Sequence, residues 1–319
     1  MRKFLHLLLA LCAVTGTATA QTWPERPIRM IVPFAAGGSA DFFARLIIPK
    51  MTASLGQPVI IENRPGAGGV IGDDIVAKAA PDGYTIALSG KGSLVLAPHM
   101  MKVPYSAFDD FAYITLISSV PNVLAVHSAL GVASVAELIA AARKSPGKLN
   151  YGSAGNGSTL HLAGELLKEV ANIDIVHVPY KGVAPAINDL LGGQVQMLVG
   201  NINVMIPHVK SGKIKALAVT STKRAGLLPD VPTMIEAGMP AMTGDDVYGL
   251  IGPAKLPPDI LQKLLKAGAA AAVAADVVEK FAQMGALATP TTSEEYKKLL
   301  QTDSAMWAGV IKRANIHLD

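Results

Sequence analysis

The segment Ile28–Asp41, IRMIVPFAAGGSAD, joins a short apolar run to a glycine-rich turn, and the amphipathic run FFARLIIPKMTASL follows it. A strand, a loop of small residues and a helix in this order form the basic unit of α/β proteins. The start of such a helix has free backbone N–H groups and a partial positive charge, so it can hold an anion without a charged side chain. The segment therefore predicts an α/β fold and raises the question of which anion the loop binds.

The same alternation of patterns continues along the chain. The other β-rich runs are Val59–Glu62, Tyr84–Leu88, Ile114–Ile117, Val123–Val126, Asn150–Tyr151, Ile175–Val178, Val195–Val199, Ala216–Val219 and Val247–Ile251. Helical patterns cover Ala40–Leu55, Val135–Arg143, Leu160–Val170, Ala184–Leu191 and Ile260–Ala271. We therefore expect parallel sheets covered by helices, with ligands bound beyond the carboxyl ends of the strands.

A second glycine loop, Gly152–Thr159 (GSAGNGST), follows the run Asn150–Tyr151 and also leads into a helix. The two loops are far apart in the sequence, which suggests two domains that face each other across a cleft. The runs Pro121–Val126 and Asp245–Ile251 are bordered by turn residues and are the hinge candidates. We expect one discontinuous domain of residues 21–124 and 245–319 and a second domain of residues 125–244.

The first twenty residues, MRKFLHLLLALCAVTGTATA, have a basic start, an apolar core and an Ala-Thr-Ala ending, as secretory signal peptides do. We expect cleavage after Ala20; the apolar core is too short for a membrane anchor. Cys12 is the only cysteine and follows Leu11, where a lipidation site would have a small residue. The mature chain should therefore have no disulfide and no thiolate metal site.

Charge and loop composition narrow the ligand class. The formal charge is +4, of which two belong to the signal segment, and the remaining basic residues are interspersed with acidic ones, which argues against nucleic-acid binding. PFAAGGSAD has neither the Gly-Lys-Ser/Thr ending of a nucleotide loop nor the GxGxxG spacing of a dinucleotide site. The anion is more consistent with a carboxylate than with a phosphate, and no cofactor is expected.

Individual loop residues each have a structural and a functional interpretation. Ser39 and Ser158 could donate hydroxyl hydrogen bonds to an anion or simply cap their helices. Asp41 could complement the helix dipole, which we favour, or select ligands with an amino group and repel a second carboxylate. Tyr180 and Asn201 follow predicted strands and are expected at the same edge as the two loops.

Catalysis and metal binding are weakly supported. Ser158 and His161 are three residues apart on a predicted helix, the spacing at which a serine and a base could meet. No GxSxG segment exists, and the histidines lack the paired spacing of metal ligands. We therefore expect no catalytic residue and no metal, and a secreted serine hydrolase is the least favoured alternative.

The chain also resembles a known family through most of its length. The segments that carry the resemblance are WPERPIRMIVPFAAGGSADFFAR, LGQPVIIENRPGAGGVIG, APDGYTIAL, YGSAGNGSTLHLAGELL, VPYKGVAPAINDLLGGQVQMLV, SGKIKALAVTS, LPDVPTMIEAG and GLIGPAKLPPDI. Together they resemble the solute-binding proteins of tripartite tricarboxylate transporters, the Bordetella uptake gene group. Many segments in the family's order are more specific than either loop alone.

The resemblance implies a two-domain periplasmic-binding-protein (Venus flytrap) fold with parallel-rich sheets and a central ligand cleft. It implies a periplasmic monomer that binds a small organic acid through loops 34–41 and 153–159 and serves membrane permease subunits. Family pockets tend to lack charged contacts, and Lys91 in the segment SGKGSLVLAPHM is a departure from the family pattern. The expected ligand contacts are Phe34, Gly37, Gly38, Ser39, Asp41, Ser89, Lys91, Ser153, Gly155, Gly157, Ser158, Thr159, His161, Tyr180 and Asn201.

Two questions stay open at the level of sequence. A sensory protein that presents its closed form to a receptor kinase would have the same fold and pocket as a transport protein. The ligand could be a tricarboxylate, a dicarboxylate, an aromatic acid or an amino acid.

Overall fold

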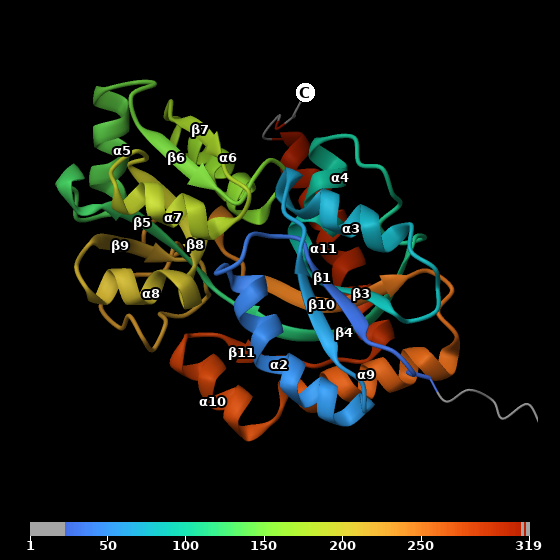
Figure 1. Ribbon diagram of the computed structural model, residues 1–319. Helices are drawn as coiled ribbons and strands as arrows, with labels where there is room; N and C mark the ends of the chain where they lie inside the picture. The colour runs from blue at the N-terminus through green and yellow to red at the C-terminus, as the bar shows by residue number, and fades with distance from the viewer. Residues whose placement is uncertain (1–22, 314–315, 317–319) are drawn as a thin grey trace, which may run out of the picture.

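Two β-sheets, each covered by helices, form two lobes in the computed structural model, which describes residues 23–313 and 316 (Figure 1). The first sheet has the strand order β11-β4-β10-β3-β1-β2 and the second has the order β7-β6-β8-β5-β9. The strands of the first sheet are β1 (Ile28–Val32), β2 (Val59–Asn63), β3 (Thr85–Gly90), β4 (Phe111–Val120), β10 (Asp246–Pro253) and β11 (Leu287–Ala288). Those of the second are β5 (Asn122–His127), β6 (Asn150–Ser153), β7 (Val176–Pro179), β8 (Met197–Asn201) and β9 (Ile214–Val219).

The helices divide between the two lobes in the same way (Figure 1). Those of the first lobe are α2 (Ser39–Leu55), α3 (Val70–Ala77), α4 (Ala97–Met100), α9 (Pro258–Ala272), α10 (Ala275–Gln283) and α11 (Ser293–Arg313). Those of the second lobe are α5 (Val135–Lys144), α6 (Thr159–Ala171), α7 (Val183–Leu191) and α8 (Ile202–Lys210). Short helical turns are η1 (Ala67–Gly69), η2 (Gly92–Leu96), η3 (Ser128–Leu130) and η4 (Pro240–Met242).

Both sheets are mixed. β1 pairs in parallel with β2 and β3, and β6 pairs in parallel with β7 and β8. β10 and β5 run antiparallel to their neighbours because each enters its sheet after the chain has crossed from the other lobe. The first crossing is at Pro121, between β4 and β5, and the second lies between β9 and β10. The sheets are therefore less purely parallel than the alternation of patterns predicts.

The alternation of patterns nevertheless located the elements well. The predicted strand Ile28–Val32 has the bounds of β1, and each other predicted strand overlaps an observed one. The predicted helices overlap α2, α5, α6, α7 and α9. The predicted ranges did not include the two-residue strand β11, the short helices α3, α4, α8 and α10, or the long C-terminal helix α11.

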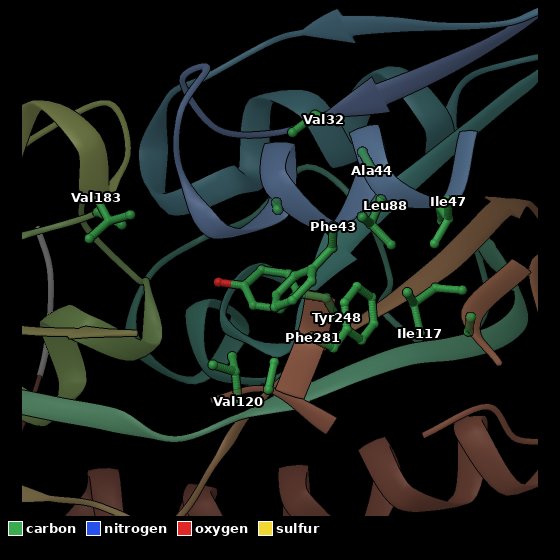
Figure 2. Packing of buried hydrophobic residues seen from close by; sticks show 14 of the residues in the cluster. Val32, Phe43, Ala44, Ile47, Leu88, Ile117, Val120, Val183, Tyr248 and Phe281 are labelled. Atoms are coloured by element: carbon green, nitrogen blue, oxygen red, sulfur yellow. The ribbon is translucent and has the colours of Figure 1, made fainter. Parts of the chain in front are cut away.

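An aromatic cluster fixes the start of β10 against α2. The ring of Phe43 on α2 lies 5.0 Å from that of Phe281 on α10 and 5.4 Å from that of Tyr248 on β10, measured between centroids. Figure 2 shows the hydroxyl of Tyr248 pointing out of the apolar cluster. Offset and tilted ring pairs stabilise beyond their buried area. The cluster thus holds the polar end of Tyr248 beside the first turn of α2.

Over residues 23–313 and 316, the structure has no helix that is both long and apolar enough to span a bilayer. The predicted signal peptide and its cleavage after Ala20 lie outside the described residues.

Candidate functional site

A small cavity lies between the two lobes, beyond the carboxyl ends of β1, β6 and β8. Both glycine loops reach it. Six of the residues predicted as ligand contacts line it: Phe34, Gly38, Ser39, Ser158, Thr159 and Asn201. Seven further lining residues were not predicted as contacts: Ala40, Gly92, Ala154, Leu160, Val183, Asp246 and Tyr248.

Two helix starts face this cavity, one from each lobe. Ser39 and Ala40 begin α2, and Thr159 and Leu160 begin α6. Within the part of the chain that the structure describes, the backbone N–H groups of these four residues have no hydrogen-bond acceptor. Free N–H groups and the positive ends of two helix dipoles therefore meet at one cavity, an arrangement that favours an anion.

The first loop is held from behind by Asp41. Its carboxylate accepts hydrogen bonds from the backbone N–H of Gly37 at 3.0 Å, from Arg45 at 2.8 and 3.0 Å, and from Asn63 at 3.1 Å. Burial alone would raise the pKa of Asp41, but these hydrogen bonds outweigh it and hold the pKa below its ordinary value. Neither Asp41 nor Gly37 lines the cavity, which favours the structural role of Asp41 over contact with a ligand.

Ser158 caps the second helix. Its hydroxyl oxygen accepts a hydrogen bond from the backbone N–H of His161 at 3.2 Å. The imidazole of His161 instead accepts from the N–H of Gly157, at 3.3 Å from Nδ1. The serine hydroxyl and the imidazole are therefore not arranged as a nucleophile and its base, although Ser158 remains in the cavity wall.

A stack of rings supports the second loop. The ring of His161 lies 3.9 Å from that of His177, which in turn lies 4.9 Å from that of Tyr151. Burial lowers the pKa of His161 to about 4 and that of His177 to about 3, and the neighbouring ring adds to the second shift. Both imidazoles are therefore neutral near pH 7.

Ser153 joins this stack to the loop backbone. Its hydroxyl lies 2.6 Å from Nε2 of His177 and accepts from the N–H of Gly155 at 3.0 Å. The side chain of Ser153 is fully buried. Neither Ser153 nor Gly155, Gly157 or His161 lines the cavity, so these predicted contacts hold the loop from behind.

Hydrogen bonds cross from one lobe to the other around the cavity, so the structure is a closed arrangement. One of them joins backbone groups, and the others involve side chains. They run from Ala35 N to Lys181 O at 3.0 Å, from Ser39 Oγ to Asn203 Oδ1 at 2.9 Å, from Thr159 Oγ1 to Asp246 Oδ2 at 2.7 Å, from Tyr248 Oη to Asn201 Oδ1 at 2.9 Å, and from Asn201 Nδ2 to Asp246 Oδ2 at 3.4 Å.

Two glycines allow this close approach. A Cβ on Gly68 would lie 2.3 Å from the carbonyl oxygen of Asn156, and the φ of Gly68 is +60°. A Cβ on Gly92 would lie 2.9 Å from the backbone nitrogen of Thr159. Any side chain at either position would collide with the second loop in the closed arrangement.

Asp246 places a carboxylate in the cavity wall. It is 3% exposed and receives hydrogen bonds from Thr159, as above, and from the N–H of Val247 at 3.1 Å. Asn201 Nδ2 lies 3.4 Å from it and also donates to Asn122 Oδ1 at 2.7 Å. Burial raises the pKa of Asp246, and the charge of Lys91 and the hydrogen bonds oppose that shift.

The remaining predicted contacts lie outside this cavity. The Ser89 hydroxyl donates to Asp73 at 2.8 Å, and that of Tyr180 donates to Asp189 at 2.6 Å. Lys91 lines a separate small cavity, where its ammonium donates to the carbonyl oxygen of Asp245 at 2.5 Å and lies 3.5 Å from the Asp303 carboxylate.

Strand direction explains why Asp246 and Tyr248 were missed. The carboxyl ends of strands mark the ligand-binding edge of a sheet only where neighbouring strands run parallel. β10 runs antiparallel to β3, and Tyr248 pairs with Gly90 at the end of β3. The beginning of β10 therefore reaches the same edge of the sheet. The sequence feature that could have identified these contacts is the presence of an acid and a tyrosine in the predicted hinge Asp245–Ile251.

The described residues contain no group of three or more histidine, cysteine, aspartate or glutamate side chains that could hold a metal ion.

Comparison with known proteins gives consistent matches. The sequence model of one protein family, the tripartite tricarboxylate transporter family receptor, matches residues 43–316 of this chain. The chain is similar to protein BugT of Bordetella pertussis, with 36% identity over 98% of this chain and 96% of that protein.

Solved structures resemble this one closely. The periplasmic binding protein BugD has a TM-score of 0.89 and 36% identity over 92% of this chain and 99% of BugD. A Rhodopseudomonas palustris protein with adipate has a TM-score of 0.88 and 35% identity, over 92% of this chain and 99% of that one.

Proposed function

Because the chain belongs to the tripartite tricarboxylate transporter receptor family, whose members are periplasmic solute-binding receptors, we propose that it captures a small organic carboxylate between its two lobes. The observation that carries this proposal is the meeting of two helix starts, with free N–H groups, at one cavity. The related structure with adipate supports a carboxylic acid as the ligand class.

We further propose that the protein is exported, loses residues 1–20 and works as a monomer that delivers its ligand to membrane permease subunits. The N-terminal pattern of a basic start, an apolar core and Ala-Thr-Ala supports export. We propose that it catalyses no reaction, and the engagement of the Ser158 hydroxyl by a backbone N–H supports this. Delivery to a receptor kinase is the alternative, and its pocket would be the same.

Two domains that move relative to each other would perform the capture. We propose domains of residues 21–124 with 245–319, and of residues 125–244. The separate sheets and the two crossings of the chain support a division near these positions, with the first crossing at Pro121 and all of β5 in the second sheet. The hydrogen bonds between the lobes belong to the closed form, so a ligand must favour that form to be trapped, since equal affinity for both forms would shift nothing.

Thermal unfolding of the mature protein tests the proposal, after the protein has been unfolded and refolded to remove carried-over ligand. The probes are straight-chain acids of three to six carbons in four forms, namely the plain monocarboxylate, its ω-hydroxy and ω-amino derivatives and the dicarboxylate, each paired with the amide of its carboxyl group. A ligand at a hundredfold excess over its Kd stabilises the folded state by about 2.7 kcal/mol, which raises the midpoint measurably. Acids should raise the midpoint and amides should not. Carboxylate capture is contradicted if no acid raises the midpoint, or if the amides raise it as much as the acids do.

A further inference from the structure

Asp246 is an acidic side chain in the wall of a cavity whose helix starts favour an anion. Its Oδ2 accepts from the hydroxyl of Thr159 at 2.7 Å and lies 3.4 Å from Asn201 Nδ2 and 3.5 Å from the hydroxyl of Tyr248. These donors are all neutral. Among the residues that the structure describes, no basic side chain forms an ion pair with Asp246, because the nearby ammonium of Lys91 is bound to the Asp245 carbonyl and lies beside Asp303.

The cavity therefore has two chemically different parts. The starts of α2 and α6 offer backbone donors, which suit one carboxylate. The carboxylate of Asp246 offers only acceptors, and its Oδ1 has a single hydrogen bond, from Val247 N–H, so it can accept another.

A second carboxylate on the ligand would be repelled by Asp246, whereas a hydroxyl or ammonium group would bond to it. Repulsion between like charges is strong here because Asp246 is 3% exposed and little water screens it. A buried acceptor also discriminates sharply against a ligand that leaves it without a donor.

We propose that Asp246 determines specificity, by admitting a monocarboxylic acid that carries a hydrogen-bond donor and rejecting dicarboxylates. The inference rests on the proposed carboxylate capture and narrows its ligand class. It also separates this chain from the related protein that was solved with adipate, a dicarboxylic acid.

The test measures dissociation constants by calorimetry for matched acids of four and five carbons. At each length the set is the plain monocarboxylate, its ω-hydroxy and ω-amino forms, and the dicarboxylate. The refolded wild-type protein should bind the hydroxy or the amino acid at least tenfold more tightly than the dicarboxylate. In Asp246→Asn the ratio of the dicarboxylate Kd to the Kd of the hydroxy or amino acid should fall at least tenfold, because the repulsion between the two carboxylates is gone. A larger loss for the amino acid than for the hydroxy acid would identify an ammonium as the donor.

Asp245→Asn is the matched control, because Asp245 is the adjacent acid but lines the other cavity. It should keep the wild-type ratio. If Asp246→Asn does not fold, Asp246→Ser provides the same comparison. The order of affinities measured on the wild-type protein is a test that needs no variant. The proposal is overturned if the wild-type protein prefers the dicarboxylate. It is also overturned if neither Asp246→Asn nor Asp246→Ser changes the ratio of the two affinities. If none of the acids binds any variant, carboxylate capture itself fails.

Discussion

The two glycine loops have similar compositions and both end at a helix start, yet they are held in different ways. The first loop is tied to its own lobe by a charged cluster of Asp41, Arg45 and Asn63. The second is supported by neutral, stacked imidazole rings. Both loops are approached closely by glycines of the opposite lobe, the first by Gly182 and the second by Gly68 and Gly92. The first loop is thus fixed by charged and amide side chains and the second by packed rings, and both loops gain their contacts with the opposite lobe only on closure.

The front contacts of the second loop should be the most sensitive. In Gly68→Ala the new Cβ would lie 2.3 Å from Asn156 O and 2.7 Å from Ser158 N, so the lobes could not close fully. Ligand affinity should fall about a hundredfold, or about 2.7 kcal/mol, measured by calorimetry. Gly131→Ala is the control, since Gly131 also has a positive φ, +72°, but has no neighbour within 4 Å. Equal affinities in both variants would show that closure does not need this contact.

The charged support of the first loop comes next. Asp41→Ala should lower the free energy of unfolding by about 1–3 kcal/mol, because the N–H of Gly37 loses its acceptor. Denaturant unfolding measures this loss. Asp276→Ala, which removes an acid that is 67% exposed and paired with Lys50, should change the free energy of unfolding little. If Asp41→Ala instead kept its stability and lost only affinity, Asp41 would be a ligand contact.

The two lobes should also respond to pH with opposite sign. The pKa of His161 is lowered to about 4, so the unfolded chain binds the proton first and stability falls as the pH drops from about 6.5 to 4. Burial raises the pKa of Asp73, which receives hydrogen bonds from Ser89 and Ser93, to about 7. Its contribution to stability is therefore complete below about pH 4 and is lost as the pH rises to 7.

Asp73→Asn isolates the second effect. Between pH 4 and 7 the stability of this variant relative to wild type should rise with pH, by on the order of 1 kcal/mol per unit, as followed by urea unfolding. A difference that is constant across this range would mean that Asp73 titrates normally in the folded protein.

The smallest effects should separate the two helix-start serines. Ser158→Ala removes a helix cap and should cost about 1 kcal/mol of stability. Ser39→Ala removes a hydrogen bond between the lobes, to Asn203, and should weaken ligand binding by about two- to tenfold with little change in stability. The reverse pattern, measured by unfolding and calorimetry on both variants, would assign the ligand contact to Ser158 instead.

Sequence patterns predicted the strands, the two loops and their helix starts because each depends on local spacing and small residues. They could not predict which loop side chains turn toward the cavity. Tyr180 turns to Asp189 and Ser89 to Asp73, contacts that depend on partners elsewhere in the fold. They also missed Asp246, whose position follows from the antiparallel direction of β10.

The free N–H groups at the starts of α2 and α6 have a consequence for change over generations. They belong to the main chain, so apart from proline no substitution at Ser39, Ala40, Thr159 or Leu160 removes them. The side chains around the cavity can therefore mutate without abolishing the affinity for an anion. A gene duplicate would be able to acquire a new substrate through one or two replacements, at positions such as Asp246, while it still works as a receptor.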